Sequence, residues 1–132
     1  MASIFSRIVS GEIPCHKIAE SDHFLAFLDV MPLVEGHVLV IPKKEVDYIF
    51  DLDTNTYDAL WSFARTVATG LKKAIPCKRI GLAVIGLEVP HTHIHLVPMN
   101  EIGDINFTRT KLKPTQEELA AVAEKIRTFT AA

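Results

Sequence analysis

His91-Thr92-His93-Ile94-His95-Leu96-Val97-Pro98 is the stretch that decides the fold, because histidine recurs in it at every second position. The apolar residues between and after the histidines predict a β-strand, in which successive side chains point to opposite faces. We therefore expect His91, His93 and His95 on one face, with neighbouring imidazoles roughly 7 Å apart. Three imidazoles in a row are costly to bury. They need a phosphate, a metal ion or a supporting network of hydrogen bonds.

The residues around this stretch predict a sheet with one long helix. In residues 54–74, Leu60, Ala64, Val67 and Leu71 recur at three- and four-residue steps, which indicates a helix with one apolar stripe. Further strands are expected over residues 16–19, 23–29, 37–41 and 79–85, and shorter helices over residues 3–11 and 115–129. Because strands precede, flank and follow the long helix, we expect an antiparallel α+β fold rather than a βαβ arrangement.

The composition excludes several classes of function. The 132 residues are enough for one core, so we expect a single domain over residues 1–132. The 14 basic and 16 acidic residues leave a net charge of −2, without the basic surface of a nucleic-acid-binding protein. The sequence has neither an apolar run of about 20 residues nor a signal peptide, so we expect a cytoplasmic protein without membrane contact. Cys15 and Cys77 belong to no CxxC pair and are expected as free thiols.

Three roles for the histidine row follow from its chemistry. A His-x-His pair on a strand is a possible zinc ligand set, completed by ligands from elsewhere. Alternatively, one neutral imidazole attacks phosphorus while a neighbouring ring stabilises the anionic oxygens. A purely structural role would require a hydrogen-bond partner for every ring, which is improbable for three aligned histidines.

A second segment narrows these alternatives. Residues 36–44, Gly-His-Val-Leu-Val-Ile-Pro-Lys-Lys, place another histidine, His37, at the start of a buried strand. Together with residues 4–14, residues 25–29 and the histidine row, this segment resembles the histidine-triad (HIT) family, in particular its Hint-like branch. The resemblance covers residues 4–98 and implies a single HIT domain with a five-stranded antiparallel sheet, one long helix and a C-terminal helix. It also implies a homodimer in which two sheets join into ten strands, with the long helix at the interface.

The resemblance also implies an activity and roles for particular residues. Proteins of this family hydrolyse or transfer nucleoside monophosphates through a covalent nucleotidyl-histidine intermediate. His93 corresponds to the nucleophile, and His95 to the histidine that contacts the phosphate and the leaving group. His91 and His37 would orient this network. Asp29 corresponds to an aspartate that holds both ribose hydroxyls, a suitable role for a carboxylate.

The expected nucleotide pocket has one ordinary part and one unusual part. The base would lie in an apolar slot lined by Ile4, Phe5, Ile8, Phe27 and Val30. These residues are equally suited to a hydrophobic core. The phosphate loop would include Gly86, Leu87 and Glu88. Relatives have a glutamine and a small hydroxyl residue at the last two positions. Leu87 donates no hydrogen bond and an inward-facing Glu88 would repel phosphate, so the pocket must differ.

A second departure concerns metal. Many relatives hold a structural zinc with a CxxC, a histidine after the PKK sequence and the first histidine of the triad. In this chain Ser3 and Ser6 occupy the cysteine positions, and Glu45 follows the PKK sequence. Serine hydroxyls are poor zinc ligands. We therefore expect no metal and no other cofactor.

These observations favour an enzyme that cleaves purine nucleoside 5′-phosphoramidates or related nucleotide conjugates, with an AMP-like ligand. One alternative is a dinucleoside polyphosphate hydrolase that uses the same histidines. A second is a nucleotide-binding HIT protein with weak turnover, caused by the altered Leu87-Glu88 segment. A third is a metal-binding triad. The sequence after Pro98 does not match the usual Hint ending, which leaves the leaving group open.

Overall fold

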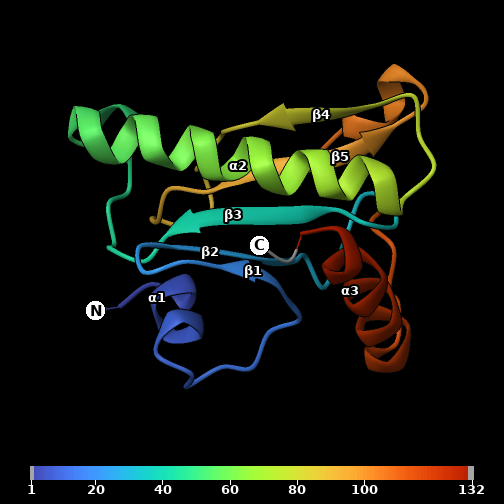
Figure 1. Ribbon diagram of the computed structural model, residues 1–132, viewed down its shortest axis with the longest axis horizontal. Coiled ribbons are helices and arrows are strands. Elements are labelled where there is room, and N and C mark those ends of the chain that lie inside the picture. The colour runs from blue at the N-terminus through green and yellow to red at the C-terminus, as the bar shows by residue number, and fades with distance from the viewer. Residues whose placement is uncertain (1, 131–132) are drawn as a thin grey trace.

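Five antiparallel strands form one sheet in the computed structural model, which describes residues 2–130 (Figure 1). Their order across the sheet is β1-β2-β3-β5-β4, so β3 and β5 lie side by side in its interior. This arrangement confirms the predicted antiparallel α+β fold. The strands are β1 (Lys17–Glu20), β2 (Phe24–Leu28), β3 (Val38–Pro42), β4 (Arg79–Ala83) and β5 (Ile94–Met99).

Three α-helices pack on the two faces of the sheet. The long helix α2 (Thr54–Ala74) and the C-terminal helix α3 (Gln116–Thr130) cover one face and contact each other, while α1 (Ile4–Val9) packs on the other face (Figure 1). The bounds of α2 are those predicted from the sequence. Side chains cap two of the helix starts: Ser3 accepts a hydrogen bond at α1, and Asp53 does so at α2. Two short 3-10 helices, η1 (Ile49–Asp51) and η2 (Ile102–Ile105), lie in the connections.

Alternation along the strands divides the core into two layers. Side chains of one parity pack under α2 and α3, and those of the other parity pack under α1. The α1 layer is small and contains Phe5, Leu25, Phe27, Leu39 and Ile41. Because it fills only part of this face of the sheet, the remainder of the face is available for polar side chains.

One predicted strand is shorter than expected, because β5 begins at Ile94 and not at His91. Its pairing with β3 ends at Val40 opposite Ile94, and Pro42 has no N–H group with which to continue it. The segment before β5 is held instead by bonds from His91 to the Pro42 carbonyl and from Thr92 to the Val46 carbonyl. Only one histidine of the row therefore lies within the strand.

Other expectations agree more closely. Strand β4 ends at Ala83, two residues before the predicted end at Ile85. Cys15 and Cys77 are both free thiols. Within residues 2–130, no helix combines the length and the apolar composition needed to cross a bilayer.

Candidate active site

The three histidines of the row are buried together on the α1 face of the sheet. The ring centroids of His93 and His95 are 4.9 Å apart. The Phe5 ring of α1 contacts the row edge-on, with centroids 5.0 Å from His93 and 5.8 Å from His91. His91 is fully buried, and His93 and His95 retain exposed fractions of only 7% and 9%. The extended backbone thus keeps all three rings on one side although the strand has not yet begun at His91.

Backbone carbonyls determine where His91 and His93 carry their protons. A carbonyl can only accept, so the 2.7 Å contact between His91 Nε2 and the Pro42 oxygen requires a proton on Nε2. His93 Nδ1 likewise donates to the His91 carbonyl oxygen at 2.7 Å. A neutral His93 ring then has its lone pair on Nε2, which makes no hydrogen bond within residues 2–130. His93 therefore presents a nucleophilic nitrogen.

A second chain of bonds orients His95. The Leu33 amide donates to His37 Nδ1 at 3.1 Å, so the proton of a neutral His37 is on Nε2. His37 Nε2 lies 3.0 Å from His95 Nδ1 and donates to it. His95 consequently carries its own proton on Nε2. The network therefore pairs a free lone pair on His93 with an N–H donor on His95.

Burial favours the neutral forms of His37, His91 and His95. Desolvation lowers the pKa of His37 to about 4 and that of His95 to about 3, and mutual repulsion among the histidines adds to the effect on His95. Desolvation also lowers the pKa of His91, against the opposing effect of its bond to the Pro42 carbonyl. Neutral rings are required for the tautomers described above.

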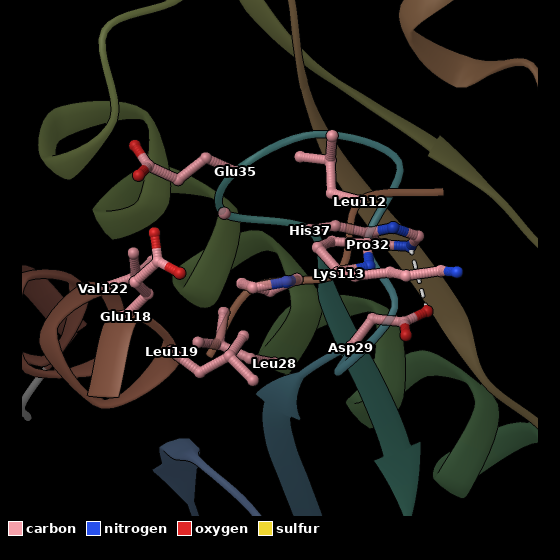
Figure 2. Close-up of a pocket in the computed structure, with 12 residues that line it drawn as sticks. Leu28, Asp29, Pro32, Glu35, His37, Leu112, Lys113, Glu118, Leu119 and Val122 are labelled. Atoms are coloured by element: carbon pink, nitrogen blue, oxygen red, sulfur yellow. Dashed lines mark ion pairs between the residues drawn. The ribbon is translucent and has the colours of Figure 1, made fainter. Parts of the chain in front are cut away.

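Asp29 lies at the edge of this network, directly after β2. Its Oδ2 is 3.9 Å from His37 Nε2, and its Oδ1 accepts a hydrogen bond from the Met31 amide. The dashed line in Figure 2 marks the pair of Asp29 and His37. Burial raises the pKa of the Asp29 carboxyl, while the Met31 amide and the positive charge of Lys111 act in the opposite direction. One carboxylate oxygen thus remains available to a ligand beside the histidines.

The four positions at which many relatives hold zinc form a hydrogen-bonded cluster in this chain. We name this cluster the Ser–Glu clasp: Ser3, Ser6, Glu45 and His91. The Ser3 hydroxyl donates to His91 Nδ1 at 2.8 Å, and Glu45 accepts from the Ser3 amide at 2.6 Å and the Ser6 hydroxyl at 2.7 Å. These bonds lower the pKa of the Glu45 carboxyl to about 2.

This cluster does not fit a structural zinc. Its donors lack the thiolates that zinc prefers, and the lone pair of His91 Nδ1 is already used by the Ser3 hydroxyl. The Ser–Glu clasp instead ties α1 to the segment before β5 by hydrogen bonds alone. Because the His91 carbonyl in turn holds His93, the clasp also positions the nucleophilic ring.

One further group has the composition of a metal site. Asp29, His37 and His95 each offer a ligand atom, and these atoms lie within 4.8 Å of one another. However, the Leu33 amide occupies the lone pair of His37 Nδ1, so Nε2 of a neutral His37 is protonated and cannot bind a metal. The hydrogen-bonded arrangement therefore competes directly with metal binding.

The residues expected to form the base slot divide between core and surface. Phe5 and Phe27 are buried and pack edge-on at 5.6 Å, and Ile8 is half-buried beside them. Ile4 and Val30 are exposed, with accessible fractions of 47% and 50%. The first group acts as core, whereas the second group is free to contact a ligand.

The side chains of the expected phosphate loop are exposed, and the negative charge of Glu88 contributes to raising the pKa of Asp29. Leu87 has 90% of its surface exposed, and Glu88 is also exposed. Gly86 adopts φ of +75°, a conformation that favours glycine. Neither Leu87 nor Glu88 forms a hydrogen bond through its side chain within residues 2–130. Within this loop, only backbone amides could therefore donate to a phosphate.

Sequence reasoning missed one segment of the site, residues 106–112, named here the strap. Its Phe107 ring lies against His95, with ring centroids 4.7 Å apart, and 6.3 Å from the His37 ring. Lys111 lies close enough to lower the pKa values of His37 and His95 by repulsion. The strap has neither helical nor strand periodicity, so no sequence signal placed it against the histidines.

A cavity of about 290 Å³ adjoins the site beneath the β2–β3 connection. Figure 2 shows that it is bordered by Asp29 and His37 on one side and by α3 on another. Leu28, Leu119 and Val122 supply much of its apolar wall. His93 and His95 do not line it, so it is separate from the nucleophilic nitrogen.

Comparison with known proteins identifies the class to which this fold and site belong. Residues 10–102 match a family model described as HIT domain. An uncharacterized HIT-like protein of Mycoplasma genitalium is 35% identical over 131 residues, covering 92% of each chain. The chain therefore belongs to the HIT family, whose members are generally nucleotide hydrolases.

More particular relatives support the Hint-like resemblance. The adenosine 5′-monophosphoramidase hnt1 of Schizosaccharomyces pombe is 32% identical over 132 residues and covers 96% of each chain. Among solved structures, a HIT-like protein of Bartonella henselae involved in cell-cycle regulation superposes with a TM-score of 0.84 at 31% identity. That alignment covers 96% of this chain and 94% of the other.

Proposed function

We propose that this protein is a nucleotidyl hydrolase or transferase that cleaves purine nucleoside 5′-phosphoramidates or related nucleotide conjugates through His93. One observation carries the proposal: the bond from His93 Nδ1 to the His91 carbonyl leaves a lone pair on Nε2. A nucleophilic histidine needs this tautomer. The phosphoramidase activity named for the S. pombe relative supports the choice of substrate.

The proposed reaction has two displacements at phosphorus. In the first, His93 Nε2 bonds to phosphorus while the phosphorus–nitrogen bond breaks, and the amine departs after taking up one proton from solvent. In the second, water bonds to phosphorus, His93 leaves with its electron pair, and one proton returns to solvent. His95 Nε2–H donates to the leaving-group side, and His37 maintains that orientation through its 3.0 Å bond. No metal ion is needed for either step.

The remaining residues bind the nucleotide in this proposal. Asp29 accepts hydrogen bonds from the ribose hydroxyls, and the exposed apolar side chains of Ile4 and Val30 contact the purine base. Residues 1–132 act as one HIT domain in the cytoplasm. We further propose a homodimer in which β4, an edge strand, pairs with its copy to form a ten-stranded sheet.

The proposal is tested by hydrolysis of adenosine 5′-phosphoramidate in the presence of a chelator. We expect wild-type protein to release AMP and His93→Ala to be at least about 10³-fold slower. His23→Ala is the matched control, because His23 is an exposed histidine outside the network. Equal rates for His93→Ala and wild type would refute the assignment of the nucleophile. A loss of wild-type activity on chelation would refute the metal-free reaction.

A further inference from the structure

The strap is an ordered part of the catalytic face. Phe107 packs edge-on against His95, the ring that carries the proposed N–H donor. At the start of the strap, Asn106 accepts hydrogen bonds from the Arg109 and Thr108 amides. At its end, the Leu112 amide donates to the Pro32 carbonyl at 2.9 Å. The Phe107 contact and the Leu112 bond therefore hold the residues between them next to His95 and the β2–β3 connection.

Lys111 lies between the two fixed points and brings a positive charge to the site. Lys111 is partly buried, and its positive charge contributes to lowering the pKa values of Asp29, His37 and His95. No carboxylate within residues 2–130 forms an ion pair with it. A partly buried lysine without a carboxylate partner, on a segment that packs against His95, is suited to a bound anion.

The proposed reaction needs such a cation. Negative charge on the phosphoryl oxygens must be matched by donors that are already in place. Leu87 and Glu88, at the positions where HIT relatives usually have phosphate-binding side chains, are exposed, and their side chains offer no hydrogen-bond donor. The strap follows the histidine row in sequence and approaches the site from a different element.

We propose that Lys111 binds the phosphate group of the nucleotide, while Phe107 holds the His95 ring beside that phosphate. This inference rests on the proposed function, since it assigns the phosphate contact of the same site. Asp29 would lie on the ribose side of the phosphate and His95 on the leaving-group side. Lys111 lies in the strap between Phe107, which packs on His95, and Leu112, which is bonded to the Pro32 carbonyl three residues after Asp29. This position between the leaving-group side and the ribose side is where the phosphate would lie. The strap thereby provides a phosphate contact that the side chains of Leu87 and Glu88 do not supply.

Binding measurements separate this role from others. We expect Lys111→Gln to weaken AMP binding about 10- to 100-fold in titration calorimetry, the loss of one charge-assisted contact. Adenosine has no phosphate, so its affinity should change less than about 2-fold. Lys111→Arg should restore most of the affinity for AMP. Lys125→Gln, on the exposed side of α3, makes the same change in net charge and should bind AMP like wild type.

Two outcomes would overturn the proposal. Unchanged AMP affinity in Lys111→Gln would show that Lys111 does not bind the phosphate. Equal losses of AMP and adenosine affinity would show that it acts through Asp29 or through folding of the strap. Because these are binding measurements, they are independent of turnover. A wild type that binds AMP without cleaving phosphoramidates would refute the proposed function and still leave the Lys111 contact testable.

The role of Phe107 is tested by kinetics. Phe107→Ala should lower kcat for adenosine 5′-phosphoramidate about 10-fold or more, with a smaller change in KM. The reason is that the substitution removes the packing that holds the His95 ring, which acts in the chemical step. Phe107→Leu keeps much of the packing volume and should recover part of kcat. A change confined to KM, or a variant kinetically identical to wild type, would overturn the positioning role.

Discussion

Removal of the Ser3 hydroxyl tests whether the Ser–Glu clasp holds the site together. In wild type this hydroxyl caps α1 by accepting from the Ser6 amide, and it donates to the fully buried His91 Nδ1 at 2.8 Å. Loss of an N-cap costs about 1 kcal/mol. A buried acceptor left without a donor costs about 1–3 kcal/mol. Ser3→Ala should therefore lower the free energy of unfolding by about 2–4 kcal/mol.

Urea denaturation at fixed protein concentration measures this difference. The matched control is Ser10→Ala, at the other end of the same helix. The Ser10 hydroxyl donates to the Arg7 carbonyl at an exposed position, so its loss should change stability by no more than about 0.5 kcal/mol. If Ser3→Ala is no more destabilising than Ser10→Ala, the Ser–Glu clasp does not support the histidine segment and the argument fails.

Two other predictions concern protonation and metal. The pKa values of His37 and His95, about 4 and about 3, lie below the 6.5 of an unperturbed histidine, so between these values the unfolded chain binds more protons than the folded chain. The stability from neutral burial is therefore complete above pH 6.5 and is lost as the pH falls toward 4, at up to about 1.4 kcal/mol per pH unit for each histidine. Urea midpoints that are equal at about pH 7 and pH 5 would contradict this. The second prediction is that the triple variant Ser3→Cys, Ser6→Cys, Glu45→His binds one zinc ion per chain, because the Ser–Glu clasp already brings these positions together around His91. Elemental analysis after gel filtration measures the zinc content. Equal zinc contents of the variant and wild type would show that the geometry is unsuitable.

The fold was predictable wherever periodicity was strong. The apolar stripe from Leu60 to Leu71 located α2 correctly. The histidine row was harder, since alternation indicated that the three rings share a face but not that β5 begins only at Ile94. Where the strand begins depends on Pro42 of the neighbouring strand, which stops donating to the ladder. Such tertiary effects are absent from a local pattern.

The candidate site was predictable in part for a related reason. The resemblance indicated the four histidines and Asp29, and the structure brings them together. It did not indicate that Ser3 and Glu45 would form hydrogen bonds at the place where many relatives hold a zinc ion. The position of the strap at the site could not be predicted, because Phe107 and Lys111 lie in a segment without periodicity. Their proximity to His95 depends on how the chain returns across the sheet.

The stereochemical course at phosphorus tests the central claim most directly, that His93 forms a covalent nucleotidyl intermediate. One phosphorus diastereomer of adenosine 5′-phosphoramidate carrying a sulfur on phosphorus would be hydrolysed in ¹⁸O-labelled water, and the configuration of the product determined. Each in-line displacement inverts phosphorus, so two successive displacements through His93 predict net retention. Net inversion would show that water attacks the substrate directly, and would contradict the account.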